Sequence, residues 1–376
     1  MLLDIFCVCP PGVEALLESE LRDLGLKARA VPGGAELKGM LETVARCNLW
    51  LRTASRVHVR LGSVQATKFP ELVKKASALP FELCLRRGDT VALRVTCRKS
   101  RLYHSDAVAE RLHAAIEARL GGAVKRGEAA GEEDSPADQL IVARFDRDLC
   151  TVSADASGVL LHQRGWRERG GKAPLRETLA AALLRAAAFR GTGPFLDPLC
   201  GSGTIAIEAA LLARRRAPGL QRSFALERWP AVDGALWQRL LAEAREQELP
   251  RSPVAIAASD QDAGAIALAR GNAERAGVAG DIDITQRPLS LVVPPPGPGT
   301  LVTNAPYGVR VGAEADLRKL YRELGELARS RLRGWTLLVL GADPRLAHAA
   351  GLPWEQRLKT QNGGIPVVAL RSNMQS

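Results

Sequence analysis

A glycine-rich turn between an expected strand and an expected helix has residue types that fit a nucleoside ligand. The turn reads Asp197-Pro198-Leu199-Cys200-Gly201-Ser202-Gly203-Thr204. Gly201 and Gly203 let the backbone bend and approach a ligand closely, and a helix beginning near Thr204 would present free N–H groups. The lysine of a phosphate-binding loop is absent, and Ala206 stands where a dinucleotide fingerprint has its third glycine. The turn therefore favours a nucleoside without phosphates, such as S-adenosylmethionine.

A second candidate contact for this ligand follows the next expected strand. Asp260 comes directly after the apolar run 254–259, and Gln261 follows it. A carboxylate accepts hydrogen bonds from two hydroxyl groups, such as those of a ribose. The residues that we expect to bind the methyl donor are Asp197, Pro198, Cys200, Gly201, Ser202, Gly203, Thr204, Asp260 and Gln261.

A third group of residues, Asn304-Ala305-Pro306-Tyr307, follows the expected strand 301–303 and fits the chemistry of an amine acceptor. The lone pair of an exocyclic amine is delocalised into the base, so a helpful site accepts both N–H protons and lets the nitrogen become pyramidal. The Asn304 side-chain oxygen and the backbone carbonyl of Ala305 can accept those protons, and Tyr307 can stack on the base. Such a site works by positioning and desolvation, and we expect no metal. Adenine, cytosine and guanine amines all suit this motif, so these residues leave the base open.

The elements that must position these residues alternate between short apolar strands and helices rich in alanine and leucine. Strands are expected at 195–196, 254–259, 301–303 and 337–340, and helices at 179–189 and 205–216. This alternation predicts an α/β fold with a doubly wound parallel sheet. Ligands of such sheets bind at the carboxyl ends of the strands, where Asp197, Asp260 and Asn304 fall.

The first 165 residues are organised differently. A strand at 2–8, a helix from residue 13 to 24, a turn at Gly33-Gly34 and a second helix from 41 to 51 suit half of a ferredoxin-like unit. Farther on, a strand is expected at 91–97 and a helix at 107–120. A polar stretch at 125–138 and two strands at 140–145 and 150–153 follow.

Basic and aromatic residues are concentrated in this front region. Arginine and lysine position a phosphate backbone, and an aromatic ring stacks on an unpaired base. A solvated strand edge that charge protects from aggregation is the alternative interpretation. The expected RNA contacts are Arg94, Arg98, Lys99, Arg101, Tyr103 and His104.

Composition narrows the class of protein. The net charge of +11 favours an acidic partner, although a generally basic proteome would give the same excess. No uncharged apolar run reaches the roughly 18 residues of a membrane span, and the first residues resemble a strand more than a signal peptide. The 7 cysteines include no Cys-x-x-Cys pair, which favours neither a zinc site nor a disulfide framework. We therefore expect a cytoplasmic protein, of undefined oligomeric state.

Further motifs give the chain a family resemblance. Together with the donor turn and Asn304–Tyr307, three runs resemble THUMP-containing class I RNA methyltransferases: Cys9-Pro10-Pro11-Gly12-Val13-Glu14, Arg164-Gly165-Trp166-Arg167 and Asn362-Gly363-Gly364. The chain is most similar to the guanine-N2 enzymes, among them the N-terminal half of RlmL and related tRNA enzymes. The resemblance implies a ferredoxin-like domain at 1–60, a THUMP RNA-binding domain at 61–165 and a Rossmann-like methyltransferase domain at 166–376.

The resemblance also implies a reaction. A methyl group would pass from S-adenosylmethionine to the N2 amine of a guanine in structured RNA, with 23S ribosomal RNA favoured and transfer RNA open. Ala305 departs from the usual Asn-Pro-Pro-Tyr, and no acid near Pro288 is available for the adenine amino group, so Gln286 or a backbone group would replace it. The alternatives are a catalytically weak module that binds the donor and RNA, and an amine methyltransferase acting on another base.

Overall fold

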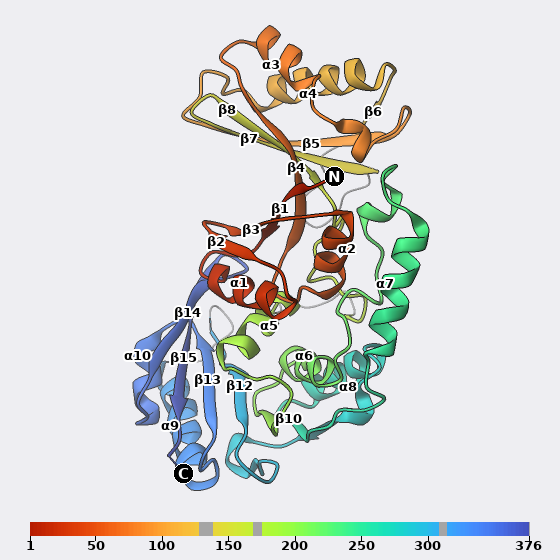
Figure 1. Ribbon diagram of the computed structural model, residues 1–376. Coiled ribbons are helices and arrows are strands. Elements are labelled where there is room, and N and C mark those ends of the chain that lie inside the picture. The colour runs from red at the N-terminus through yellow and green to blue at the C-terminus, as the bar shows by residue number, and fades with distance from the viewer. Residues whose placement is uncertain (128–137, 168–174, 308–313, 376) are drawn as a thin grey trace. The chain divides into compact units, whose positions relative to one another are not determined.

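The computed structural model describes residues 1–127, 138–167, 175–307 and 314–375 (Figure 1). Most of the polar stretch expected at 125–138 therefore lies outside the described residues. The chain divides into two compact units. Unit 1 comprises Met1–Cys9, Leu21–Leu161 and Arg222–Glu243, and unit 2 comprises Pro10–Glu20, His162–Gln221 and Ala244–Ser376.

The described part of unit 1 is built on an eight-stranded sheet with the order β2-β3-β1-β4-β8-β7-β5-β6. Its strands are β1 (Leu3–Val8), β2 (Ala28–Val31), β3 (Gly34–Gly39), β4 (Arg56–Gln65), β5 (Thr90–Arg98), β6 (Lys125–Arg126), β7 (Gln139–Asp146) and β8 (Leu149–Asp155). Its helices include α2 (Leu41–Trp50), α3 (Phe69–Ala76) and α4 (Ser105–Leu120).

Strand β4 joins the two halves of this sheet. Its first residues pair with β1, from Asp4↔Arg60 to Val8↔Arg56, and its length pairs with β8, from His58↔Asp155 to Gln65↔Leu149. The boundary expected after residue 60 falls inside this strand. The division of the front region into two domains, with THUMP as the second, stays a prediction.

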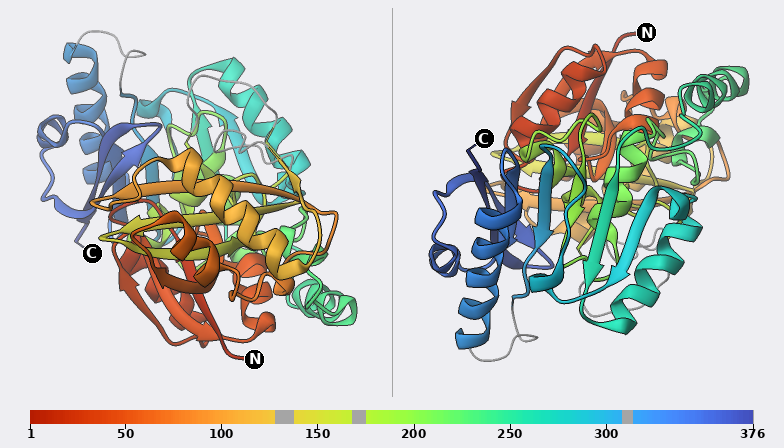
Figure 2. Two further views of the ribbon diagram at one scale, coloured as in Figure 1. Left: turned by 90° about the horizontal axis from the view of Figure 1, so that it is seen from above. Right: turned by 90° about the horizontal axis from the view of Figure 1, so that it is seen from below.

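Strand β7 is buried on both faces from Gln139 to Val142 and alternates between buried and exposed residues only in its last part. Ile141, Ala143 and Phe145 are buried, whereas Arg144 and Asp146 between and after them are exposed. Helices α3 and α4 pack side by side and lie over the strands of this half of the sheet (Figure 2, left). Arg144 and Asp146 are therefore on the face opposite to Ile141, Ala143 and Phe145.

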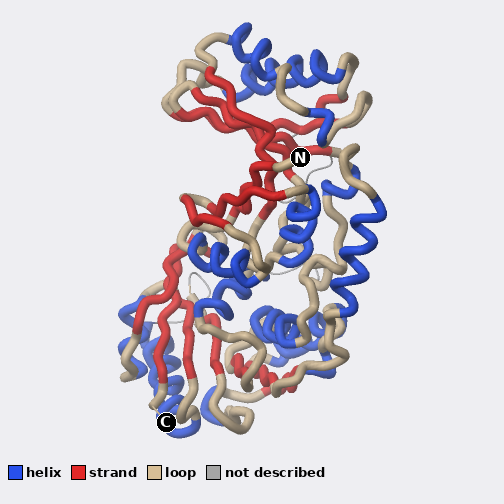
Figure 3. Tube along the Cα trace, in the orientation of Figure 1, coloured by secondary structure: helices blue, strands red, loops and turns tan. Residues whose placement is uncertain are grey.

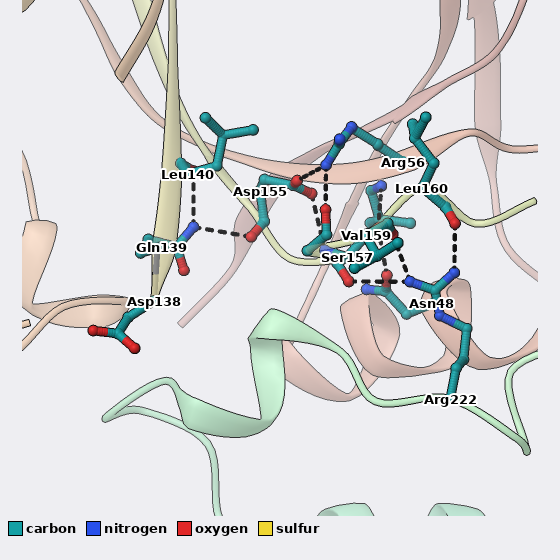
Figure 4. Close-up of polar contacts among 12 residues, drawn as sticks. Asn48, Arg56, Asp138, Gln139, Leu140, Asp155, Ser157, Val159, Leu160 and Arg222 are labelled. Atoms are coloured by element: carbon teal, nitrogen blue, oxygen red, sulfur yellow. Dashed lines mark hydrogen bonds and ion pairs between the residues drawn. The ribbon is translucent and has the colours of Figure 1, made fainter. Parts of the chain in front are cut away.

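The segment 222–243 follows the donor turn in the sequence but folds with unit 1. The Arg222 guanidinium donates to the carbonyls of Ser157, Val159 and Leu160 at the end of β8 (Figure 4). Beside it, the Ser157 hydroxyl donates to Asn48 Oδ1 at 2.6 Å, and Arg56 pairs with the buried Asp155. This polar network fixes the segment to unit 1, although the segment lies inside the range 166–376 that was expected for the methyltransferase domain.

The described part of unit 2 is built on a seven-stranded sheet with the order β11-β10-β9-β12-β13-β15-β14. Figure 3 draws strands in red and helices in blue. The strands are β9 (Phe195–Asp197), β10 (Ile256–Asp260), β11 (Ile282–Gln286), β12 (Thr300–Asn304), β13 (Thr336–Gly341), β14 (Glu355–Asn362) and β15 (Ile365–Asn373). The first five are parallel, and β14 and β15 form an antiparallel hairpin beside β13. This order confirms the expected doubly wound α/β sheet.

Helices cover both faces of the unit 2 sheet. They include α5 (Glu177–Ala186), α6 (Thr204–Ala213), α8 (Ala263–Arg275), α9 (Glu314–Arg331) and α10 (Pro344–Ala347). Helix α6 packs against α5 and α8, whereas α9 and α10 share an apolar core with alternate residues of the strands, including Leu337 and Val339. Helices α1 (Glu14–Asp23) and α7 (Gly234–Glu246) each belong in part to both units.

Within the described ranges, the structure contains no helix that is both long and apolar enough to cross a membrane.

Candidate donor and catalytic site

The strand order places the candidate site at the switch point of the unit 2 sheet. From β9 the chain proceeds to β10 and β11 on one side, and then returns to β12 and β13 on the other. Neighbouring loops therefore leave the sheet in opposite directions at the carboxyl ends of β9 and β12, which opens a crevice for ligands. Asp197, Asp260 and Asn304 are the last residues of β9, β10 and β12.

The two glycines of the donor turn have different roles. Gly201 and Gly203 both have left-handed backbones, with φ of 51° and 80°. A Cβ on Gly203 would lie 3.0 Å from the Ala269 Cβ, so this glycine lets α6 and α8 approach closely. A Cβ on Gly201 would meet nothing within 4 Å. Gly201 therefore leaves open space beside the turn where a ligand can approach the backbone.

Asp260 holds the turn in place and keeps capacity for a ligand. Its Oδ2 accepts the Gly201 N–H at 2.9 Å, and its Oδ1 accepts the Asp262 N–H at 3.0 Å. Each carboxylate oxygen can accept a second hydrogen bond. The carboxylate is half-buried at the open side of the turn, which suits the ribose contact expected for it.

Asp197 lies deeper than Asp260. Its Oδ1 accepts the Thr303 hydroxyl at 2.7 Å, while no hydrogen-bond partner for Oδ2 occurs among the described residues. Burial raises the pKa of Asp197 to about 7, against the hydrogen bonds from Thr303 and the Leu199 N–H. Near neutral pH this carboxyl can therefore change its charge. Burial also raises the pKa of the neighbouring Cys200 thiol, which stays protonated.

The remaining expected donor residues line the same turn. Pro198 and Thr204 are buried, Ser202 is half-buried and Gln261 is exposed. The Ser202 carbonyl accepts Asn272 Nδ2 of α8 at 3.0 Å, and the Gln261 carbonyl accepts Gln286 Nε2 at 3.2 Å. Gln286, one expected substitute for the missing third-strand acid, thus lies beside Gln261.

Arg167 is a residue of this region that the sequence did not reveal as part of the site. Its Nη2 donates to the Thr204 hydroxyl at 2.7 Å, and its Nη1 lies 3.5 Å from Ser202 Oγ. Its Nε donates to the buried Glu177 at 2.7 Å. The Arg164–Arg167 run was visible as a family motif, but only the folded chain brings its last residue to the donor turn.

Asn304 presents an acceptor without a partner at the end of β12. Its Oδ1 is buried and has no hydrogen-bond partner in the described parts of the chain. A buried unsatisfied oxygen is costly unless a ligand supplies the missing donor. The next residue, Ala305, is buried, and its N–H donates to the Leu340 carbonyl at 3.0 Å. A proline at position 305 would have a more rigid backbone but no N–H, so it could not make this hydrogen bond to β13.

Tyr307 is held from the β14–β15 hairpin. Asn362, the buried last residue of β14, donates from Nδ2 to the Tyr307 hydroxyl at 2.7 Å. Burial raises the pKa of Tyr307, while hydrogen bonds from Asn362 and Asn304 oppose that rise. Pro306, the residue before Tyr307, is exposed. Asn362 was quoted in a family motif, but its distance of 55 positions from Tyr307 left no local signal of this contact.

The expected RNA contacts lie in unit 1 and form a less compact set. Arg94 and Arg98 are on one face of β5, and Lys99, Arg101, Tyr103 and His104 follow in the loop before α4. The Tyr103 side chain is 67% exposed, and its ring centroid lies 4.1 Å from that of His104. These positions are available to a partner, whereas Arg94 is half-buried.

S-adenosylmethionine fits the residues at the switch point. The open space at Gly201 admits a ligand to the turn, Asp260 can accept ribose hydroxyls, and the free N–H groups of α6 face a negatively charged end. No group of three or more histidine, cysteine or acidic residues able to hold a metal ion occurs among the described residues.

Two protein-family models match parts of the chain. The model described as "RMKL-like, methyltransferase domain" matches residues 164–370, and the one described as "RlmL ferredoxin-like domain" matches residues 4–58. The matches confirm the expected Rossmann-like methyltransferase fold and the N-terminal ferredoxin-like domain, whereas the THUMP domain and the bounds of all three domains stay predictions.

Curated relatives match nearly the whole chain. A ribosomal RNA large subunit methyltransferase K/L of Syntrophotalea carbinolica is 37% identical over 96% of this chain and 52% of its own length. The putative RNA methyltransferase YpsC of Bacillus subtilis is 33% identical over 96% of this chain and 93% of its own length. The chain thus spans about half the length of the K/L proteins and nearly all of YpsC.

A solved structure supports the same assignment. SMU.472, a putative methyltransferase complexed with SAH, superposes with a TM-score of 0.89 at 30% identity, over 100% of this chain and 99% of its own. The family match and this SAH complex confirm S-adenosylmethionine as the cofactor.

Proposed function

The chain belongs to the family of RMKL-like methyltransferases, and on that premise we propose that it methylates the N2 amine of a guanine in structured RNA. The observation that carries the proposal is the buried Asn304 Oδ1, which lies at the switch point without a partner among the described residues. An amine substrate has two N–H groups, which can donate to this oxygen and to the neighbouring Ala305 carbonyl. A hydroxyl or thiol substrate has a single proton and would need only one such hydrogen-bond acceptor.

Asn304 and Ala305 would prepare the amine. Hydrogen bonds from its two N–H groups to Asn304 Oδ1 and to the Ala305 carbonyl draw the nitrogen out of conjugation with the base. The lone pair then points toward the methyl group, a new C–N bond forms as the C–S bond of the donor breaks, and the excess proton leaves to water. Because these acceptors are held in place before the base arrives, the reaction needs little reorganisation.

Tyr307 would hold the base. Its ring offers a stacking surface, and the bond from Asn362 fixes its hydroxyl, so the ring keeps one orientation. A base inside a helix could not reach this position, which requires an unpaired or flipped nucleotide.

The donor would occupy the turn and the end of β10. The donor supplies an electrophilic methyl group on a positively charged sulfur. We propose that Gly201 and its neighbours meet the amino-acid end, while Asp260 accepts the ribose hydroxyls and Gln261 flanks the adenosine. Asp197 adds a carboxyl whose burial raises its pKa to about 7, so its charge responds to a cationic amino group nearby.

The RNA substrate is supported by the relatives and by charge. Relatives that match 96% of the chain are named as a large-subunit ribosomal RNA methyltransferase and a putative RNA methyltransferase. The exposed cations of the β5–α4 region offer contacts to phosphate, and we propose residues 61–165 as the THUMP domain that provides them. Large-subunit ribosomal RNA is the favoured substrate, and transfer RNA is the second candidate.

Methylation of purified 23S rRNA and tRNA, digested to nucleosides and analysed by mass, tests the proposal. We expect N2-methylguanosine that depends on S-adenosylmethionine. Methylated adenine or cytosine without N2-methylguanosine would favour an amine methyltransferase acting on another base. Donor binding without turnover on either RNA would favour a weak donor- and RNA-binding module.

A further inference from the structure

The turn between β7 and β8 has an unusual backbone for its residue types. Arg147 and Asp148 both have left-handed backbones, with φ of 50° and 62°. Tight hairpins with two such residues prefer Asn-Gly or Asp-Gly, because side chains disfavour this conformation. Lys99, across from the turn, is left-handed as well, with φ of 47°. Three charged residues therefore hold disfavoured backbone conformations at one end of the sheet.

Asp148 ties this turn to the loop after β5. The Asp148 N–H donates to the Ser100 hydroxyl at 3.0 Å, and its Oδ1 accepts the Arg101 N–H at 2.7 Å. The Arg147 N–H donates to the Arg98 carbonyl at 3.2 Å. Two segments almost 50 positions apart in the sequence thus form one surface with a fixed backbone.

The joined segments gather exposed cations. Arg98, Lys99 and Arg101 come from the β5 side, and Arg144 and Arg147 come from the β7 side; all of them are exposed. The parallel register pairs Thr96 with Arg144 and Arg98 with Asp146, which puts Arg144 on the same face as Arg98. We call Arg98, Lys99, Arg101, Arg144 and Arg147 the basic tip.

Asp146 and Asp148 are the acids nearest this group in the sequence. The Asp148 carboxylate is engaged by Arg101: its Oδ1 accepts the Arg101 N–H at 2.7 Å, its Oδ2 lies 4.0 Å from the Arg101 Nε, and only 22% of its side chain is exposed. The exposed Tyr103 ring lies in the same loop as Lys99 and Arg101. Net positive charge with an aromatic ring beside it fits a nucleic-acid backbone with an unpaired base better than it fits an acidic protein.

We propose that the basic tip is a preformed phosphate-binding surface for the RNA substrate, with Arg144 and Arg147 as contacts that complete the loop cations. This inference rests on the proposed function, since it takes RNA as the partner. The hydrogen bonds of Asp148 and Arg147 hold the backbone that carries these cations before binding, so little loop freedom is lost when phosphate arrives. Binding should depend strongly on salt, because each phosphate contact releases counterions.

Charge reversal in the full-length protein tests the cations. Arg147→Glu and Arg144→Glu should each weaken filter binding of unmodified 23S rRNA transcript about tenfold. Each should also lower the slope of log affinity against log salt by about 1 or more. Lys27→Glu is the matched control, because Lys27 is exposed in unit 1 before β2, at the other end of the strand order. Equal effects of the tip and control variants would overturn the proposal.

Asp148→Gly tests whether the preformed arrangement matters, because charge and loop order predict opposite changes in RNA affinity for this variant. Glycine tolerates the left-handed backbone, so folding should be preserved, and the change removes a negative charge. Charge alone predicts tighter RNA binding, whereas loss of the tie to Arg101 predicts weaker binding, by about threefold or more. Tighter or unchanged binding contradicts the inference.

The failure of the surface assignment and the failure of the proposed function can be told apart. If these variants bind RNA normally while the protein still forms N2-methylguanosine, the surface assignment fails and the proposed function stands. If wild type forms no N2-methylguanosine, the proposed function fails by itself.

Discussion

The carboxyl edge of the unit 2 sheet and the basic tip of unit 1 are assembled in different ways. At the sheet edge, Asp197, Asp260 and Asn304 each end a strand, and the parallel topology alone brings them together. At the basic tip, Arg98 and Arg147 come together through hydrogen bonds between a loop and a turn. Functional residues at strand ends can therefore be predicted from the sequence, whereas a surface assembled from a loop and a turn can be recognised only in the folded structure.

The two regions also differ in burial. The oxygen of Asn304 and the carboxyl of Asp197 are buried, where one lost hydrogen bond is costly. The side chains of the basic tip are exposed, where salt and water weaken each contact. Single substitutions should therefore have large, specific effects at the edge and smaller, salt-dependent effects at the tip.

The largest effect is expected for Asn304→Ala. Loss of the acceptor should lower turnover at least about 100-fold, because the amine loses a preorganised partner. Donor affinity by calorimetry and RNA affinity by filter binding should stay within about twofold of wild type. Normal turnover would remove Asn304 from the proposed mechanism, and a large loss of RNA affinity would show that the two regions are not separable in function.

Asp260→Ala should affect the donor first. The change removes an acceptor for the ribose and the bond that holds the Gly201 N–H. We expect donor affinity to fall about 10- to 100-fold, as for the loss of hydrogen bonds to a charged group. Calorimetry with S-adenosylhomocysteine measures this, and RNA affinity is the control. A reduced turnover at saturating donor with unchanged donor affinity would contradict the assignment.

Asn362→Ala should have a smaller effect, through Tyr307. Without the Asn362 donor, the tyrosine ring loses its fixed orientation, and we expect kcat to fall about five- to tenfold. Asn362→Gln carries the same amide on a longer chain and should restore part of the activity. Tyr307→Phe should make the Asn362→Ala change nearly silent, since the bond is already absent. Additive losses in the double variant would show that the two residues act separately.

The smallest effect is expected from Asp197→Asn, and it depends on pH. Burial raises the pKa of Asp197 to about 7, above the ordinary 3.8, so the folded protein binds the proton more tightly than the unfolded chain does. The stability that this proton provides is present below about pH 4 and is lost as pH rises toward 7. Both proteins are compared without donor. We therefore expect the unfolding temperature of the variant, relative to that of wild type, to rise by about a few degrees as the pH increases from 4 to 8. A pH-independent difference would show that Asp197 does not titrate in this range.

Much of the catalytic half could be predicted from sequence because its signals are local. An apolar run followed by a polar residue marks a strand end, and the doubly wound topology then gives its neighbours. Asn362 and Arg167 could not be placed in the same way. Both residues are distant in sequence from the groups that they contact, and only folding brings them there. Asn362 reaches Tyr307 from the hairpin β14–β15, and Arg167 reaches Thr204 from the start of the methyltransferase domain.

The front half was harder to predict for a related reason. Strand β4 pairs with β1 and β8 at once, so the sheet continues across the boundary expected after residue 60. Residues 222–243 pack with unit 1, although their sequence neighbours belong to unit 2. Local periodicity reports which face of an element is buried and does not report which unit buries it.

The most direct test of the central claim is to map the modified nucleotides in total RNA from a strain that lacks this protein. We predict that one N2-methylguanosine is missing, that wild type restores it and that Asn304→Ala does not. An unchanged set of N2-methylguanosines, or full restoration by Asn304→Ala, would contradict the account.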